Sequence, residues 1–226
     1  MNPDQTRQQV VPGRRFYQRY GKKIFDRLAG LIIFLLISPV LLLIYVILRF
    51  TIGSPVVFRQ ERAGLMGKPF TNYKFRSMTN QLDASGCLLP DEQRITRVGW
   101  IVRSASLDEL PQIFNVLKGE VSLVGPRPLH IRYLERYTSR QARRQEVMPG
   151  ITGWVQINGR NNLSWEEKFE LDVWYVDHQS FLLDLRILIL TFWKVMKREG
   201  ISSEGFVAAP EFMGSNSQRV GEKPGR

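Results

Sequence analysis

Two adjacent carboxylates, Asp108 and Glu109, stand near the start of the segment SLDELPQIFNVLKG (106–119). The segment has the pattern of a helix, and Pro111 is compatible with the first turn, where N–H groups have no intrahelical partner. A purely structural interpretation is available, because acidic residues complement the helix dipole and Ser106 with Glu109 has the spacing of a capping box. This stretch alone therefore leaves two alternatives, a helix cap and a reactive pair of carboxylates.

Basic residues from separate segments favour the reactive pair. They are Lys74 and Arg76 in YKFRSM (73–78), Arg103 five positions before Asp108, and Arg127 in the turn VGPRP (124–128). A lone arginine is more often part of a surface ion pair, so the argument rests on the whole set. Guanidinium groups bind phosphate oxygens bidentately, and a carboxylate can hold Mg²⁺ or attack phosphorus to form an acyl phosphate. The set predicts phosphoryl chemistry.

Other chemistries lack their motifs. The stretch GLMGKP (64–69) has neither the spacing nor the Ser/Thr of a Walker A loop, no G-x-G-x-x-G follows a strand, and no nucleophile elbow is present. His130, His178 and the single Cys87 are too few for a usual zinc site, so a metal here would be a hard, oxygen-liganded ion such as magnesium. The single cysteine also excludes an intramolecular disulfide.

The composition indicates one ordinary domain with an added hydrophobic element. The chain has 226 residues, 43% of them hydrophobic, and a formal net charge of +11. Such an excess suits polyanions, namely nucleic acid, anionic lipid head groups or phosphorylated small molecules, although a solubilising surface charge gives the same number.

The hydrophobic element is LAGLIIFLLISPVLLLIYVIL (28–48), which is long enough to cross a membrane as a helix. Pro39 leaves the carbonyl of Leu35 without its helical donor, so we expect a bend there, with Ser38 replacing part of the lost bonding. Both flanks are basic, which places both ends on the cytoplasmic side. A re-entrant helix broken at Ser38–Pro39 satisfies both observations, and a kinked spanning helix is the alternative.

The remaining pattern predicts an α+β fold that is mostly helical. Residues 54–78 read as two short strands around a turn, and 79–96 as a loop. Helices are expected over 106–118, 129–145, 165–178 (with a Ser164–Glu167 capping box) and 181–198. The last helix would carry an apolar face for a membrane interface or a core, formed by Leu185, Leu188, Ile189, Phe192, Trp193 and Met196. The tail after Gly214 reads as disordered.

From about residue 19 to 214 the sequence resembles the bacterial sugar transferases, the monotopic polyprenyl-phosphate phosphoglycosyl transferases. The motifs that carry this resemblance are KKIFDRLAG, SPV, YKFRSM, SLDELPQIFNVLKGEVSLVGPRP and PGITGWVQINGRNNLSWEEKFELDVWYVDHQSF. The chain resembles the minimal form, and 200–214 is similar to the branch that handles diacetylbacillosamine-type sugars. The division this implies is a basic segment 1–20, a re-entrant helix 21–50, a cytosolic catalytic domain 51–205 and a tail 206–226.

The resemblance implies transfer of a sugar phosphate from a UDP-sugar to undecaprenyl phosphate with release of UMP, at the cytoplasmic face of the bacterial inner membrane. Asp108 would be the nucleophile and the Mg²⁺ ligand, Glu109 would assist as a base or by orienting the site, and Arg103 and Arg127 would bind phosphate. Lys74 and Arg76 join that set. Nucleotide or sugar contacts are expected at Pro126, Pro128, Asn158, Arg160 and Asn161, although a tight structural turn explains residues 151–169 equally well.

The rival functions are a membrane-tethered nucleic-acid binder, which leaves the Asp-Glu pair unexplained, and an inactive scaffold, which would be expected to lose Asp108. Membrane lipids are expected partners and nucleic acid is not. A homodimer and contacts with later glycosyltransferases are compatible with the sequence, which does not fix the sugar, the pathway or the oligomeric state.

Overall fold

The apolar run and its basic flanks form one long helix. The structure, a computed structural model, describes residues 16–159, 163–197 and 211–214. A π-helical turn, η1 (Tyr17–Gly21), leads directly into α2 (Lys22–Thr51), which contains Pro39. The stretch Tyr17–Thr51 is long and apolar enough to cross a membrane. The chain is therefore expected to associate with membranes through this helix.

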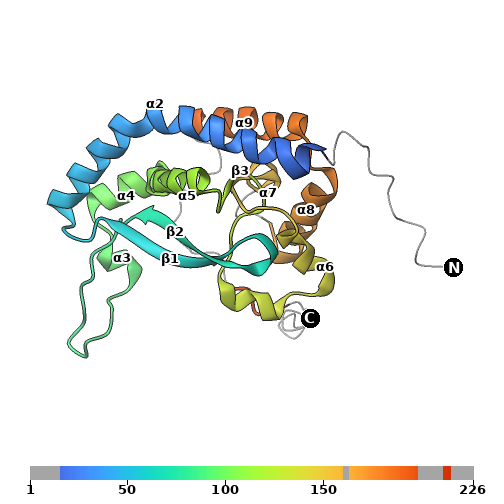
Figure 1. Cartoon of the computed structure of the whole chain (residues 1–226). Helices are drawn as coiled ribbons and strands as arrows, with labels where there is room; N and C mark the ends of the chain where they lie inside the picture. The colour runs from blue at the N-terminus through green and yellow to red at the C-terminus, as the bar shows by residue number, and fades with distance from the viewer. Residues whose placement is uncertain (1–15, 160–162, 198–210, 215–226) are drawn as a thin grey trace.

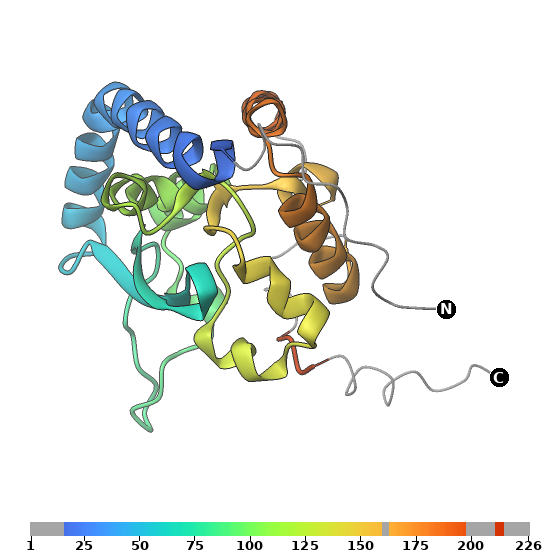
Figure 2. The ribbon, with the colours of Figure 1, turned by 45° about the vertical axis from the view of Figure 1, so that its right-hand side comes forward.

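Helix α2 continues through its proline, and its ribbon is strongly bent (Figures 1 and 2). The hydroxyl of Ser38 donates to the carbonyl of Leu35 at 3.0 Å, which is the acceptor that Pro39 cannot serve. The expected compensation by Ser38 is thus confirmed. The re-entrant path through a membrane stays a prediction.

One side of α2 packs on the rest of the protein. Leu41, Ile44 and Leu48 are buried in the main core, whereas most apolar side chains of the helix are exposed. Gly30 allows the close approach to α5 (Ile113–Lys118), because a Cβ there would lie 2.9 Å from Cγ1 of Val116. The membrane helix is consequently packed against the domain that carries the Asp-Glu pair.

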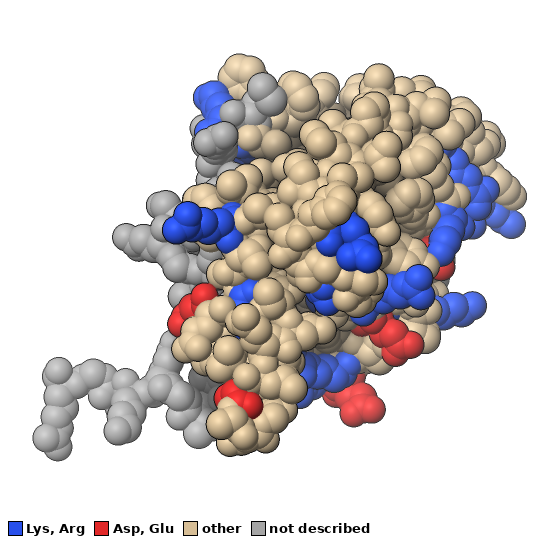
Figure 3. Space-filling model, turned by 90° about the vertical axis from the view of Figure 1, so that its left-hand side faces the viewer, with Lys and Arg blue, Asp and Glu red and all other residues tan. Residues whose placement is uncertain are grey.

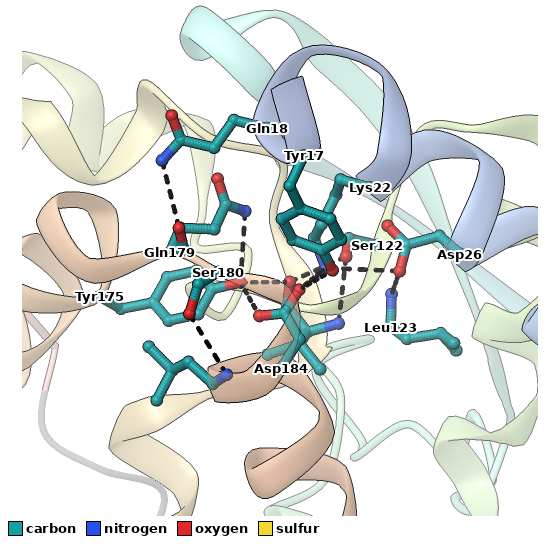
Figure 4. A network of polar contacts seen from close by, with 12 residues as sticks. Tyr17, Gln18, Lys22, Asp26, Ser122, Leu123, Tyr175, Gln179, Ser180 and Asp184 are labelled. Carbon is teal, nitrogen blue, oxygen red and sulfur yellow. Dashed lines mark hydrogen bonds and ion pairs between the residues drawn. The ribbon is translucent and has the colours of Figure 1, made fainter. Parts of the chain in front are cut away.

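A buried ionic network fixes the start of α2 (Figure 4). Nζ of Lys22 lies 2.6 Å from Asp184 and 3.4 Å from Asp26, and all three residues are almost fully buried. Asp184 also accepts hydrogen bonds from the hydroxyls of Tyr17 and Tyr175, at 2.6 and 2.7 Å. Because buried charges are tolerated only when paired and hydrogen-bonded, this network sets where the helix leaves the domain.

The predicted hairpin is present. Strands β1 (Val57–Ala63) and β2 (Pro69–Phe75) pair antiparallel around η2 (Leu65–Gly67). After it, the stretch predicted as a loop contains the short α3 (Asp91–Arg94), and α4 (Arg97–Ser104) follows, capped by the Thr96 hydroxyl. Helix α4 was not predicted. Gly99 is the residue at which it touches the chain after the hairpin, since a Cβ there would lie 1.9 Å from the Ser77 carbonyl oxygen.

Two predicted helices are not continuous α-helices. The segment 106–118 begins as a 3-10 turn, η3 (Leu107–Gln112), and becomes α-helical only in α5. The segment 129–145 is divided into η4 (Ile131–Arg136), α6 (Ser139–Ala142) and η5 (Arg143–Gln145). A capping box between Thr138 and Gln141 restarts the chain in the middle of the second segment, which the apolar pattern did not reveal.

A second, parallel pair of strands was not predicted. Strand β3 (Ser122–Val124) pairs with β4 (Gly150–Thr152), and α7 (Trp154–Asn158) follows β4 directly. Strand β3 is fully buried and leads into the GPRP sequence, so this pair holds the loop that carries Arg127.

The last two helices are as predicted. Helix α8 (Trp165–His178) begins with the Ser164–Glu167 capping box, and α9 (Phe181–Met196) contacts the start of α2 through the Lys22–Asp184 ion pair and the Phe25–Phe181 ring contact. Of the expected apolar face of α9, Leu185, Ile189, Phe192 and Trp193 are 38–67% exposed, Leu188 packs against the main core, and the side chain of Met196 lies outside the described residues. The buried positions of the helix are Asp184 and Ile187. The exposed face favours the membrane-interface alternative over the core.

The distribution of charged side chains on the surface agrees with one side of the protein facing a membrane. Figure 3 shows a face whose upper part carries few charged side chains, with basic residues around and below it and acidic residues mainly in its lower half. The overall class, mostly helical with a small β-hairpin, is confirmed. Residues 1–15 of the basic segment, residues 206–210 and the tail after Gly214 lie outside the described residues.

Candidate active site

The Asp-Glu pair lies in an unusual turn. Ser106 has a left-handed backbone (φ 57°) and makes no side-chain cap, so the predicted Ser106–Glu109 capping box is absent. Pro111 fits because the turn is 3-10 at this point and the helix starts two residues later. The structural alternative for Glu109 is therefore wrong, and its carboxylate is used elsewhere.

Glu109 binds two cations from distant segments. Nζ of Lys74 on β2 lies 2.6 Å from Oε1, and Arg127 donates from Nη2 to Oε1 and from Nη1 to Oε2, the latter at 3.3 Å. The Glu109 side chain is 19% exposed and that of Lys74 21%, while Arg127 is 47% exposed. Glu109 therefore holds both cations in place, and both cationic side chains stay partly exposed.

The pKa values of the two carboxyls are shifted in opposite directions. Burial raises the pKa of Asp108 to about 6, helped by the negative charge of Glu109 and opposed by Lys74, Arg103 and Arg127. Burial also acts to raise the pKa of Glu109, but the charges and hydrogen bonds of Arg127 and Lys74 outweigh it and hold that pKa far below its usual value. Near neutral pH both are ionised, and only Asp108 is close to its protonation range.

A buried ion pair between Arg144 and Asp172, which the sequence did not suggest, holds the GPRP loop in position. Nη2 of Arg144 donates to the carbonyl of Arg127 at 2.7 Å, and Nε of Arg144 donates to Asp172 on α8 at 2.9 Å. Both residues are 4% exposed. Arg144 stands in the basic run RQARRQ, where nothing in the sequence distinguishes it from the more exposed Arg140 and Arg143.

Glycine is required where the loop crosses the strands. A Cβ on Gly125 would lie 2.2 Å from the Met148 carbonyl oxygen, and the amide of Gly150 donates to the Pro126 carbonyl at 2.9 Å. Pro126 is thus fixed by a backbone contact. A role of Pro126 and Pro128 in nucleotide or sugar contacts stays a prediction.

Arg103 and Arg76, the other predicted phosphate-binding residues, make different contacts. Arg103 on α4 influences Asp108 electrostatically and donates to Sδ of Met78 at 3.9 Å. Arg76 donates to the carbonyl of Ile52 at 3.0 Å, just after the end of α2, and so ties the membrane helix to the hairpin. Lys74, Arg103 and Arg127 therefore surround the Asp-Glu pair. The hydrogen bond of Arg76 goes instead to the carbonyl of Ile52.

The amide-rich segment does not join this group through its described contacts. The amide of Asn158 donates to the Trp154 carbonyl within its own helix, α7, which packs on α8 and α9. Trp154 stacks on Trp174, at 4.6 Å between ring centroids. The predicted residues Arg160 and Asn161 lie outside the described residues.

No cluster of three or more metal-ligating side chains occurs in the described parts of the chain. A carboxylate such as Asp108 can still supply one ligand, because Mg²⁺ is commonly held by one or two carboxylates together with substrate phosphates and water.

The fold and site combine a long apolar helix, a carboxylate pair at different pKa values and three surrounding cations. Residues 17–198 match the family model described as bacterial sugar transferase. The chain belongs to the bacterial sugar transferase family of polyprenyl-phosphate phosphoglycosyl transferases, which are transferase enzymes.

Three relatives represent the range of similarity. The uncharacterized sugar transferase EpsL of Bacillus subtilis is 58% identical over 194 residues, covering 86% of this chain and 96% of that protein. The UDP-glucose:undecaprenyl-phosphate glucose-1-phosphate transferase of Klebsiella pneumoniae is 42% identical over 76% of this chain and 39% of its own length. The undecaprenyl-phosphate galactose phosphotransferase of Salmonella typhimurium is 38% identical over 80% of this chain and 42% of its own length. The chain thus spans about two fifths of these two longer relatives.

Proposed function

We propose that the protein transfers a sugar 1-phosphate from a UDP-sugar to undecaprenyl phosphate and releases UMP. The observation that carries the proposal is the placement of Asp108 among Lys74, Arg103 and Arg127, with Glu109 fixing two of the three. The names of several relatives, which specify UDP-glucose or undecaprenyl phosphate, support the substrate classes.

The proposed reaction has two displacements at one phosphorus. An Oδ of Asp108 forms a bond to the β-phosphorus, the bond from that phosphorus to the bridging oxygen breaks, and UMP departs with the electron pair. An oxygen of the lipid phosphate then attacks the same phosphorus, the bond to Asp108 breaks, and the carboxylate is regenerated. The pKa of Asp108, about 6, leaves it ionised and nucleophilic at neutral pH.

The remaining residues supply positioning and charge. Lys74, Arg103 and Arg127 stabilise the equatorial phosphoryl oxygens, on which negative charge is spread during transfer. The depressed pKa of Glu109 makes it a poor proton acceptor at neutral pH, so of its two predicted roles we favour orientation. In this proposal Glu109 is a positioning residue for Lys74 and Arg127.

Magnesium fits this donor set through Asp108. The Glu109 oxygens are already bound by cations, so Asp108 would be the protein ligand and substrate phosphates would complete the coordination. When bound, the ion would polarise and neutralise phosphate oxygens. The protein's own part is to hold the carboxylate among fixed positive charges.

The exposed apolar sides of α2 and α9 would place the site at the level of the lipid head groups. A lipid phosphate resides there, and a UDP-sugar approaches from the cytosol, so a nucleophile at the inner-membrane surface reaches both. Re-entrance of α2 at Ser38–Pro39 would keep both termini cytoplasmic.

The test is a panel of UDP-sugars, incubated with purified protein, undecaprenyl phosphate and Mg²⁺, with UMP release as the readout. We expect at least one sugar to give lipid-dependent UMP at steady state, and Asp108→Asn to give none. Absence of UMP with every sugar in the panel, by a protein shown to be folded, contradicts the proposal.

A further inference from the structure

One face of the hairpin carries Lys74 near one end and Arg62 near the other, with Gln60 and Asn72 between them. In the antiparallel register Phe58 pairs with Lys74, Gln60 with Asn72 and Arg62 with Phe70. Cross-strand partners and residues two apart share a face, so Arg62 lies on the same face as Lys74, about 13 Å farther along the strands. Long side chains from both ends can therefore reach the same ligand.

Arg62 is a half-buried cation with an unfilled donor. Its Nη2 donates to the neutral Oε1 of Gln60 at 2.5 Å. Its Nε is buried and, among the described residues, has no hydrogen-bond partner. A buried guanidinium N–H without an acceptor is costly, and an anionic ligand would remove that cost.

The surroundings of Arg62 connect it to the active site. The amide of Ala63 donates to the carbonyl of Leu129 at 3.0 Å, which joins the end of β1 to the chain just after GPRP. The pKa of Arg62 is lowered to about 10, by burial first and then by the positive charge of Arg127, with partial compensation from Glu109. Arg127 and Glu109 are thus electrostatic neighbours of both Asp108 and Arg62.

His130 and Arg132 are the next electrostatic neighbours of Arg62. Burial lowers the pKa of His130, and the positive charges of Arg62 and Arg132 lower it further, so the imidazole is neutral at pH 7. Arg132 pairs with Glu211, 3.2 Å away, at an exposed site. Arg62 therefore contributes the buried charge on this side.

We propose that Arg62 binds a second phosphate group, adjacent to the phosphate that Asp108 attacks. This inference rests on the proposed function. In-line displacement puts the entering and leaving oxygens on opposite sides of the phosphorus. In the first step the leaving oxygen belongs to the phosphate of UMP, and in the second the entering oxygen belongs to the lipid phosphate. Arg62 lies on the hairpin face that carries Lys74 and is an electrostatic neighbour of Arg127, and in this proposal it serves the phosphate opposite the nucleophile in each step.

The experiment compares Arg62→Gln with Arg59→Gln. Arg59 is an exposed arginine of the same strand whose partner is Tyr73, so its side chain projects from the other face and removal of its charge is a matched control. Arg62→Lys keeps the charge but loses the guanidinium fork. Circular dichroism and thermal melting establish that each variant is folded.

The two half-reactions are measured separately. Enzyme and UDP-sugar without lipid give the first, read as one burst of UMP, and the preformed adduct with undecaprenyl phosphate gives the second. We expect Arg62→Gln to raise the half-saturating concentration about ten- to hundred-fold in both, Arg62→Lys to lie between it and wild type, and Arg59→Gln to match wild type. An effect confined to the first step assigns the bound phosphate to the nucleotide, and one confined to the second assigns it to the lipid. Wild-type saturation in both steps overturns the inference.

A binding titration separates this inference from the proposed function. UMP and, in parallel, inorganic phosphate are titrated into wild type and Arg62→Gln by calorimetry. If wild type releases no UMP from any donor, the proposed function fails, while weaker binding of either anion to Arg62→Gln still supports an anion site at Arg62. Equal binding to folded wild type and variant contradicts such a site.

Discussion

Replacement of Glu109 by Gln tests the positioning role most sharply. The substitution keeps the size of the side chain and removes the charge that holds Lys74, at 2.6 Å, and Arg127. The amide offers one acceptor oxygen where the carboxylate offered two, and its NH₂ group faces the donors of Arg127. Both cations then lose their fixed geometry relative to Asp108.

The magnitude follows from the burial of the three groups. Removing one partner of a fully buried pair costs about 3–5 kcal/mol, and a hydrogen bond to a charged group about 1.5–3 kcal/mol. Because the Arg127 side chain is 47% exposed, we take the lower range, about 2–3 kcal/mol of lost transition-state stabilisation. That corresponds to about a 30- to 150-fold loss in kcat/KM.

The assay is UMP release as a function of pH, with Glu146→Gln as control, since Glu146 forms an exposed pair with Arg143. Glu109 raises the pKa of Asp108, so its neutralisation should move the acidic limb of the profile to lower pH as the plateau falls. Full activity in Glu109→Gln, or an acidic limb that stays in place or moves to higher pH, would refute the reasoning.

Three further predictions follow from the structure. Because burial raises the pKa of Asp108 to about 6, the stability attached to its protonated form is present below the unfolded pKa near 3.8 and lost as pH rises through 6. Asp108→Asn should therefore raise the unfolding free energy at pH 8 by about 3 kcal/mol, seen as a higher melting temperature, and should leave it unchanged at pH 3. Equal shifts at both pH values would count against the burial of this carboxyl. Asp184→Asn leaves Lys22 buried with a weaker partner, and should lower the unfolding free energy measured by chemical denaturation by about 3–5 kcal/mol. The double substitution with Lys22→Met should restore much of this loss. If the losses of the two single variants simply add, the coupling of the two residues is contradicted. Replacing Ser38 and Pro39 by alanine should straighten α2 and shift it towards spanning, so that cysteines placed near the N-terminus become labelled from outside the cell; unchanged cytoplasmic labelling would show that the bend has another cause.

The elements predicted correctly were those with strong local signals. The apolar run formed α2, the alternating residues formed the hairpin, and Ser164 with Glu167 fixed the start of α8. The stretch 129–145 was misassigned because an apolar period does not show where a chain restarts, and the Thr138–Gln141 box divides it. Strands β3 and β4 are each three residues long, which is too short for alternation to be recognised.

The site was predictable in its residue types and unpredictable in its supports. Asp108, Glu109, Lys74 and Arg127 could be grouped from their chemistry, and the structure brings them together. Arg76 has the same chemistry, but its hydrogen bond goes to Ile52, which only the packing of α2 on the hairpin decides. Arg144, Asp172 and Arg62 act through long-range contacts, so a single sequence gave no reason to separate them from other charged residues.

The central claim is that Asp108 becomes covalently attached to the sugar phosphate. Incubation of the protein with a UDP-sugar and Mg²⁺ in the absence of lipid, followed by intact mass measurement, tests it directly. The account predicts a mass increase equal to one sugar phosphate, located at Asp108 by fragmentation, absent in Asp108→Asn and discharged by undecaprenyl phosphate. Lipid-dependent turnover with no adduct in the wild type, or an adduct that persists in Asp108→Asn, would contradict it.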